Sequence, residues 1–80
     1  MTPITPRNIL RHELIGLEAR VIRDSNPSNV FISGKVIDET RNTLVIRHGE
    51  KAKRIAKKDA VFLLRLPGRD VEVEGRALVG

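Results

Sequence analysis

The apolar residues near the start of the chain are spaced as on one face of a helix. Four residues carry this pattern: Ile9, Leu10, Leu14 and Ile15. Asn8 is a suitable N-cap and Gly16 can end a helix in the left-handed conformation, so the pattern predicts a short helix over residues 7–15. Such a short helix is unstable alone. Its apolar side chains must therefore pack against the rest of the chain or against a partner.

From Leu17 onward apolar and polar residues alternate, which is typical of half-buried strands. Strands are predicted over residues 17–23, 30–39, 43–48, 60–66 and 71–79. The residues expected to face inward are Leu17, Ala19, Val21, Val30, Ile32, Gly34, Val36, Leu44, Ile46, Val71 and Val73. Segment 60–66 is apolar on both faces, which predicts a central strand. Gly34 weakens its strand, which indicates a bend or a close backbone approach.

Turn-forming residues separate these strands. Residues 24–29 include Pro27, and Leu66-Pro67-Gly68-Arg69 has the type II turn pattern. At 80 residues the chain is long enough for a single domain. The predicted fold is mostly β: a small, bent antiparallel barrel of about six strands over residues 17–80, preceded by the short helix and a flexible lead over residues 1–6.

Residues 50–58 are compatible with either a helix or a strand. Their Ala, Lys, Arg and Glu residues favour a helix, on which the cations would share one face. The context favours a strand, because His48-Gly49-Glu50 can form a tight turn and a hairpin strand would bond to the strand before it. Strand preference depends strongly on context, so these residues alone leave both alternatives open.

The composition excludes several classes of protein. The chain has no Cys, so disulfides and thiolate zinc sites are excluded. No apolar run is long enough to span a membrane and the N-terminal residues lack the pattern of a signal peptide, so a cytoplasmic location is expected. The acidic residues are scattered and His12 is far from His48 in sequence, so no catalytic residue, metal site or bound cofactor is predicted.

The net charge of +5 is concentrated in one segment. Residues 41–58 contain one acid, Glu50, and seven basic residues: Arg41, Arg47, Lys51, Lys53, Arg54, Lys57 and Lys58. Such an excess is the usual footprint of a phosphate-binding surface. Base stacking is poorly supported, because the two aromatic residues, Phe31 and Phe62, both lie in apolar segments. The sequence therefore predicts electrostatic contacts to the phosphates of a folded RNA.

Three stretches of the chain carry a family resemblance. They are His12-Glu13-Leu14-Ile15-Gly16-Leu17, Gly34-Lys35-Val36 and Asp38-Glu39-Thr40-Arg41-Asn42-Thr43-Leu44. With them the chain resembles the protein component 1 family of archaeal ribonuclease P over residues 7 to about 67, most of its length. The resemblance implies a barrel similar to the Sm proteins, in which the basic run is a strand. The family pattern has Pro near the position of Ala56, so this chain departs from it there.

The resemblance also implies a function. The chain would be a non-catalytic subunit of a ribonucleoprotein that removes the 5′ leader from precursor tRNA, with a catalytic centre made of RNA that needs magnesium. The implied partners are the ribonuclease P RNA, a zinc-ribbon protein subunit and, through the complex, precursor tRNA. Alone, the chain is expected to be a monomer.

An apolar set is predicted to meet the partner protein: Ile9, Leu10, Leu14, Ile15, Phe31 and Ile37. The alternative is that the helix covers its own barrel and that a bulge turns the two strand residues inward. Two other functions are also compatible with the residues: a general Sm-like or ribosomal-type RNA-binding barrel, and a protein–protein adaptor whose basic hairpin binds an acidic partner.

Overall fold

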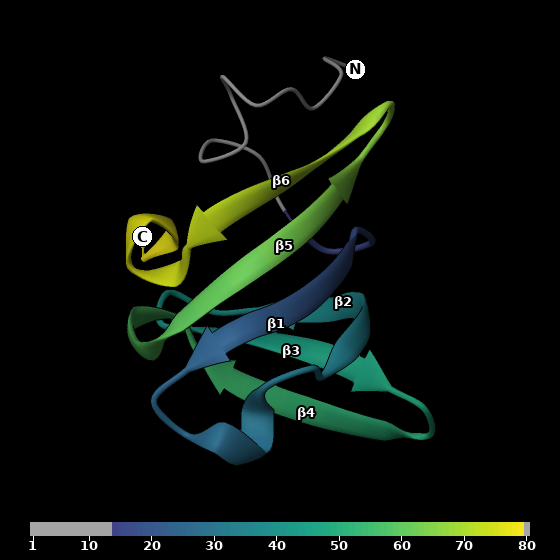
Figure 1. Cartoon of the computed structure of the whole chain (residues 1–80). Helices are drawn as coiled ribbons and strands as arrows, with labels where there is room; N and C mark the ends of the chain where they lie inside the picture. Colours follow the sequence, from purple (N-terminus) through teal and green to yellow (C-terminus); the bar gives the residue numbers. More distant parts are fainter. Residues whose placement is uncertain (1–13, 80) are drawn as a thin grey trace.

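The computed structural model describes residues 14–79, which form one antiparallel sheet of six strands (Figure 1). The strands are β1 (Glu18–Asp24), β2 (Ser33–Glu39), β3 (Thr43–His48), β4 (Lys51–Ala56), β5 (Ala60–Leu66) and β6 (Arg69–Glu74). The short 3-10 helices are η2 (Pro27–Asn29), η3 (Lys57–Asp59) and η4 (Gly75–Leu78). No α-helix occurs within residues 14–79. Most of the helix predicted over residues 7–15 lies outside the described residues, as does the predicted lead over residues 1–6.

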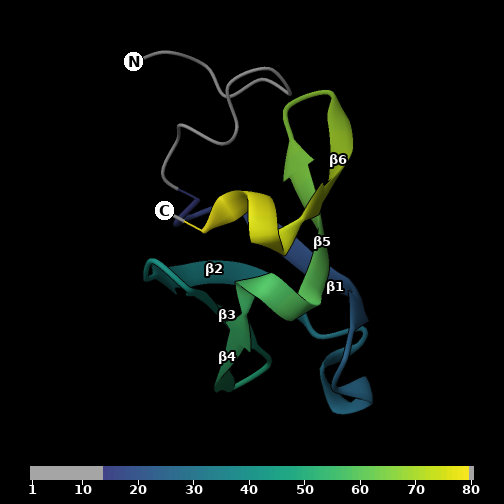
Figure 2. The ribbon, with the colours of Figure 1, turned by 90° about the vertical axis from the view of Figure 1, so that its left-hand side faces the viewer.

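The sheet is open. Its strand order, β4-β3-β2-β1-β5-β6, leaves β4 and β6 as unpaired edges, so the predicted closed barrel is corrected to an open sheet. Figure 2 shows β2–β4 and β5–β6 diverging from β1 in two directions. The register shifts in β1 between Val21 and Arg23 and in β2 between Val36 and Asp38, and such bulges increase local bend and twist. The mostly β fold is confirmed.

The alternation of apolar residues predicted the core with one clear exception. The predicted inward residues that are buried are Ala19, Val21, Ile32, Val36, Leu44, Ile46 and Val73, and Leu17 and Val71 pack against them. Val30 is the exception: it is half-buried and precedes β2, because η2 and a turn occupy residues 27–31. β5 lies between β1 and β6, as its two apolar faces predicted, and its Phe62 is fully buried.

The basic run forms a strand, β4, rather than a helix. Its register with β3 places Ile55 opposite Leu44 and Lys51 opposite His48. Gly49 lies in the turn between them with φ +63°, a conformation that favours glycine. Ile55 is fully buried, and the ladder to β3 pairs backbone groups that a short helix would leave unsatisfied at its ends. Tertiary packing thus outweighs the local helix propensity.

A buried ion pair follows β4. Lys57 is 1% exposed, and its Nζ donates to Glu39 Oε2 at 2.8 Å and to the carbonyl oxygens of Thr40 at 2.7 Å and Leu78 at 3.0 Å. The other carboxylate oxygen, Glu39 Oε1, accepts the backbone N–H of Leu14 at 3.2 Å. The pair therefore joins the start of the described chain, the end of β2, η3 and η4. Figure 2 shows η3 and η4 close together on this side.

Gly34 lets β2 pass very close to β3. Its φ is +152°, and a Cβ at this position would lie 1.8 Å from the carbonyl oxygen of Arg47. No side chain can occupy that space without moving the backbone. The close approach predicted from the glycine is confirmed.

Replacing Lys57 with Met removes the ammonium group and keeps most of the apolar stem. We expect Lys57→Met to lower the free energy of unfolding by about 3 kcal/mol, because the Glu39 carboxylate and two carbonyl groups lose their shared donor. The exposed neighbour Lys58 is the matched control, and Lys58→Met should change stability by less than about 0.5 kcal/mol. Urea unfolding followed by circular dichroism measures both. Equal, small effects would show that the ion pair does not hold these segments together.

Adding a methyl group at Gly34 tests the close approach of β2 and β3. We expect Gly34→Ala to lower the free energy of unfolding by about 3 kcal/mol or more, because the Cβ would overlap a backbone carbonyl group that cannot rotate away. Gly68→Ala is the control, since Gly68 also has a positive φ, +85°, but has open space around it. Its cost should stay near 1 kcal/mol, the usual strain of the left-handed conformation. Similar losses for the two variants would refute the contact.

Candidate nucleic-acid interface

Three cations share the outer face of β2, β3 and β4. The register places Lys35 opposite Arg47, and Arg54 opposite Val45, two residues before Arg47 in the same strand. Side chains that are paired across strands, or two apart along one strand, point to the same face. Lys35, Arg47 and Arg54 are all exposed, while Ile55 and its neighbours fill the core on the opposite face.

Two more cations lie on the other face of the same hairpin, along the edge strand β4. Lys51 is exposed beside the β3–β4 turn, and Lys53 is half-buried on the side of β4 that also carries Ile55. We call Lys35, Arg47, Lys51, Lys53 and Arg54 the cationic surface. Arg41 and Lys58 are also exposed, but they lie near the other ends of β3 and β4, in the β2–β3 turn and in η3.

Lys57 is placed differently from its six companions. It was predicted to contact phosphate, but its ammonium group is buried and donates to Glu39, Thr40 and Leu78. A phosphate could reach it only by breaking these contacts. Lys57 is therefore removed from the predicted RNA-binding set and assigned to the fold.

Lys35 was missed in the sequence, although a signal was present. It lies between Gly34 and Val36, both expected to face inward, so alternation alone places it on the outer face. Its neighbours in space could be identified only from the strand register, which pairs Lys35 with Arg47 of β3. Because Lys35 lies outside the basic run in sequence, a count of charges along the chain did not find it.

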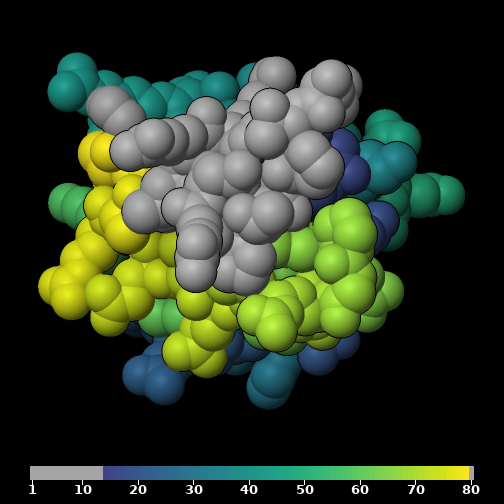
Figure 3. Space-filling view, turned by 90° about the horizontal axis from the view of Figure 1, so that it is seen from above, coloured from purple at the N-terminus to yellow at the C-terminus, as the bar shows by residue number. Residues whose placement is uncertain are grey.

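One face of β6 carries three carboxylates. Asp70, Glu72 and Glu74 alternate along β6, are exposed, and share one face because the strand period is two. Figure 3 shows β6 passing along this side of the molecule, from the β5–β6 turn to η4. Arg65, Arg69 and Arg76 offset these three carboxylates, so residues 60–78 are neutral on balance and the positive charge of the sheet is concentrated toward β4. This arrangement favours the approach of a polyanion to the β2–β4 half.

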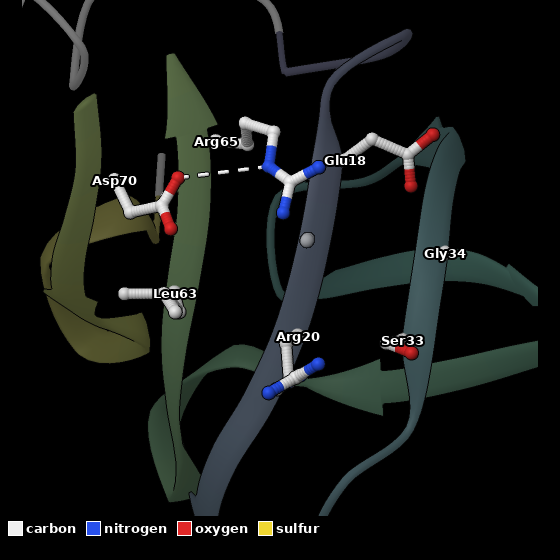
Figure 4. A pocket seen from close by; sticks show the side chains of 8 residues that line it. Glu18, Arg20, Ser33, Gly34, Leu63, Arg65 and Asp70 are labelled. Carbon is white, nitrogen blue, oxygen red and sulfur yellow. Dashed lines mark ion pairs between the residues drawn. The ribbon is translucent and has the colours of Figure 1, made fainter. Parts of the chain in front are cut away.

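A hollow of about 210 Å³ lies over β1 between the two halves. Figure 4 shows Arg65 extending over β1, with Asp70 on one side and Glu18 on the other, and Arg20 beside Ser33. Arg65 Nε lies 3.7 Å from Asp70 Oδ1, and both side chains are largely exposed. Two cations and two carboxylates line the hollow, so their charges cancel. The hollow thus lies between the cationic half of the sheet and the half whose charges cancel, and it is no anion site itself.

The predicted partner-protein residues do not form one group. Leu14 is 1% exposed and belongs to the core, so it is unavailable to a partner. Ile37 is 39% exposed although a bulge occurs at its position, so the bulge does not turn it inward. Phe31 is exposed at the opposite end of β2 from Ile37. Ile9 and Leu10 lie outside the described residues.

Three exposed apolar residues lie in segments that meet at the Lys57–Glu39 pair. Gly16 N donates to Val36 O at 2.8 Å, which places Ile15 and Ile37, the neighbours of these two residues, along the same stretch. Val79 follows Leu78, whose carbonyl group binds Lys57. Each of these three apolar side chains is about two-fifths exposed. We call Ile15, Ile37 and Val79 the apolar cluster.

A small antiparallel sheet that carries one concentrated cationic surface is typical of nucleic-acid-binding β proteins. The family model described as ribonuclease P/MRP, subunit p29, matches residues 7–80. Ribonuclease P protein component 1 of Methanocaldococcus jannaschii is 53% identical over 78 residues, covering 96% of this chain and 82% of that protein. The protein of the same name from Thermofilum pendens is 53% identical over 79 residues, covering 96% and 84%.

A solved structure supports the same assignment. The structure of Mth11, described as a homologue of the human RNase P protein Rpp29, aligns with a TM-score of 0.66 and 49% identity over 88% of this chain and 92% of that chain. The chain therefore belongs to the ribonuclease P/MRP subunit p29 family, and the resemblance seen in the sequence is confirmed.

Family membership makes the chain a protein subunit of ribonuclease P, with a role in tRNA 5′ processing. It implies association with the RNA and with other subunits of that ribonucleoprotein. In the described part of the chain, no helix is long and apolar enough to cross a membrane. The same residues include no group of three or more His, Asp or Glu that could hold a metal ion. The lack of a catalytic residue in this subunit stays a prediction.

The role of the cationic surface can be tested by reversing single charges on the two edge strands. We expect Arg54→Glu on β4 to weaken binding to a ribonuclease P RNA transcript about 3- to 10-fold and to reduce the slope of log K against log salt by about 1. Arg69→Glu on β6 makes the same charge change at the other edge and should leave affinity and slope unchanged. Filter binding at several salt concentrations measures both. Equal losses for the two variants would show that net charge, not this surface, governs binding.

Proposed function

We propose that this subunit binds ribonuclease P RNA through the phosphates that meet its cationic surface. The concentration of cations carries this proposal, because a folded RNA finds net positive charge over β2–β4, whereas the charges along β5–β6 cancel. Arg47 and Arg54 project from adjacent strands of a rigid hairpin, and guanidinium groups can bind phosphate oxygens in a bidentate manner. Such contacts fix the position of an RNA without reading its bases.

Arg41 and Lys58 provide a second contact point in this proposal. They lie near the far ends of β3 and β4 from the hairpin turn, and six strand residues span about 20 Å. An RNA backbone that follows the hairpin can therefore meet cations at both ends. The chain would hold the RNA in a defined orientation, while the RNA supplies the catalytic centre that processes precursor tRNA.

We further propose that the apolar cluster docks the zinc-ribbon protein subunit. Ile15, Ile37 and Val79 are exposed near one another, whereas Phe31 lies at the other end of β2 and is not part of this surface. Ile9 and Leu10, predicted for the same contact, precede Ile15 closely in sequence. The cationic surface and the apolar cluster then lie toward opposite ends of β2, and Arg41 and Lys58 are the proposed RNA contacts nearest to the protein partner.

Ile37→Ser tests the protein contact. We expect it to weaken binding of the zinc-ribbon subunit at least about 10-fold, because exposed apolar residues at the centre of an interface carry much of its affinity. Stability should change by less than about 1 kcal/mol, since Ile37 is already partly exposed. Val61→Ser, at a half-buried apolar residue of β5, is the control for partner binding. Calorimetry with the purified subunits measures binding.

Reconstitution tests the function as a whole. The chain, the zinc-ribbon subunit and ribonuclease P RNA are combined, and cleavage of precursor tRNA is measured at low magnesium. The wild-type pair should raise the cleavage rate, Arg54→Glu and Ile37→Ser should each reduce the gain, and Arg69→Glu and Val61→Ser should not. No gain with the wild-type pair would refute the proposed function.

A further inference from the structure

Phe31 has a backbone conformation that a phenylalanine rarely adopts. Its φ is +72°, and it is the one non-glycine residue with a positive φ among residues 14–79. The left-handed region brings the Cβ of an ordinary residue too close to its own backbone, so it favours glycine and, to a lesser degree, asparagine. A residue kept in such a conformation is a reason to look for function.

The ring of Phe31 gains nothing from the core. It is 73% exposed, the most exposed of the large apolar side chains in the described part of the chain. The fold therefore carries both a strained backbone and an unburied ring at this position. Asparagine or glycine would satisfy the same turn without either cost.

The backbone that supports the ring is held firmly. Phe31 N donates to Val21 O of β1 at 2.8 Å, and Ile32, which follows, is buried in the core. The preceding turn is also tied internally, because Asn26 Oδ1 accepts Ser28 N at 3.0 Å and Asn29 Nδ2 donates to Asp24 Oδ2 at 3.1 Å. The ring is thus presented from a fixed platform.

Cations lie in the strands next to this platform. Arg20 of β1 pairs with Ser33, two residues after Phe31, and Arg23 lies two residues beyond Val21. His48 Nδ1 lies 2.9 Å from the carbonyl oxygen of the same Ser33. His48 in turn pairs with Lys51 of the cationic surface.

Two acids also lie in this region. The Asp24 carboxylate is engaged within its own loop, where it accepts Asn26 N at 2.9 Å as well as the Asn29 amide. Glu50 is exposed in the hairpin turn. The surroundings of Phe31 therefore attract phosphate on balance, because three cations, Arg20, Arg23 and Lys51, outnumber the two carboxylates.

We propose that Phe31 is a stacking platform for an unpaired nucleobase of the bound RNA, whose flanking phosphates lie on the adjacent cations. The inference rests on the proposed RNA binding and adds a single-stranded element to it. A lone ring among charged side chains is far too small for a protein interface, which covers roughly 800 Å² on each partner. One ring is enough for one base, because each base presents a π-face to an aromatic side chain.

This assignment changes the expectation drawn from the sequence. The aromatic content predicted little stacking, and Phe31 was grouped with the partner-protein residues. The structure separates Phe31 from the apolar cluster and places it beside the cations of the hairpin end. The RNA would then be held both by its phosphates and by one base.

Phe31→Trp provides a direct reporter of stacking. The chain has no Trp and no Tyr, so the new indole would be the sole source of tryptophan fluorescence. We expect ribonuclease P RNA and a single-stranded oligoadenylate to quench this fluorescence, because a stacked base quenches an indole. Heparin, a polyanion without bases, should bind the cations without quenching. Absence of quenching by both RNAs at saturation would overturn the proposal.

The second test measures RNA affinity and thermal stability, which we expect to change in opposite directions in one of the variants. Phe31→Leu keeps an apolar side chain but removes the π-face, and it should weaken RNA binding about 5- to 100-fold with an unchanged salt slope. Phe31→Tyr should bind within about twofold of wild type. Phe31→Asn should also bind weakly, yet raise the Tm by a few degrees, roughly 2–6 °C, because asparagine tolerates the left-handed conformation. A variant that is more stable but binds less well cannot be explained by misfolding.

Two results would refute the stacking role, and they differ from a failure of RNA binding itself. If Phe31→Leu binds RNA as tightly as wild type while Arg54→Glu binds weakly, the cationic surface stands and the platform does not exist. If Phe31→Leu loses the zinc-ribbon subunit but keeps RNA, the ring belongs to a protein contact. If wild type fails to bind RNA, the proposed function fails first.

Discussion

The contact between Lys57 and Glu39 is the constraint on which the rest of the molecule depends. The edges β4 and β6 are unpaired, so backbone ladders connect the two halves of the sheet only through β1. The ion pair adds a second connection, since it joins the end of β2 and η3 to η4 and to the chain before β1. At Gly75, a Cβ would lie 1.9 Å from the carbonyl oxygen of Lys57. The absence of a side chain there lets η4 reach the ion pair.

The charge of Lys57 can be buried because the N–H groups of its ammonium group donate hydrogen bonds to nearby acceptors. The Lys57 ammonium group has a carboxylate and two carbonyl groups within 3.0 Å, so little of its lost hydration is left uncompensated. The same residue begins η3 directly after β4. Ile55 and Lys57 are buried, whereas Arg54 before them and Lys58 after them are exposed. One segment of sequence thus builds both the junction and the candidate RNA surface.

The structural features that could be predicted from the sequence are those that depend on residues close together in the chain. Alternation identified the inward side chains of β1, β3 and β6, since half-buried strands must repeat every two residues. The strand at residues 51–56 needed information from β3, against local helix propensity. Ala56, where the chain departs from the family pattern, has φ −68° and ψ 125°, an extended conformation that proline also adopts. The departure therefore left the strand unchanged.

Features that depend on distant partners could not be predicted. Lys57 looked like its exposed neighbours, because its acceptors lie on residues 16 to 21 positions away. The open edges of the sheet could not be predicted for a similar reason, because no local sequence pattern shows whether β4 pairs with β6. Phe31 was correctly expected to face away from the core. Its strained backbone arises from η2, which replaces the first residues of the predicted strand.

The polarity of the sheet links these observations to the direction in which RNA approaches. In the proposed binding mode, a nucleic acid is attracted to the positive β2–β4 half more than to the neutral β5–β6 half, so it crosses the outer face over β2 and β3 rather than over β5. On that path its backbone meets Lys35, Arg47 and Arg54 and passes the hairpin end, beside which Phe31 is displayed. The apolar cluster lies at the other end of β2, beside the ion pair, and stays uncovered. Separation of the two surfaces follows from the length of β2, and their relative orientation is held by Lys57.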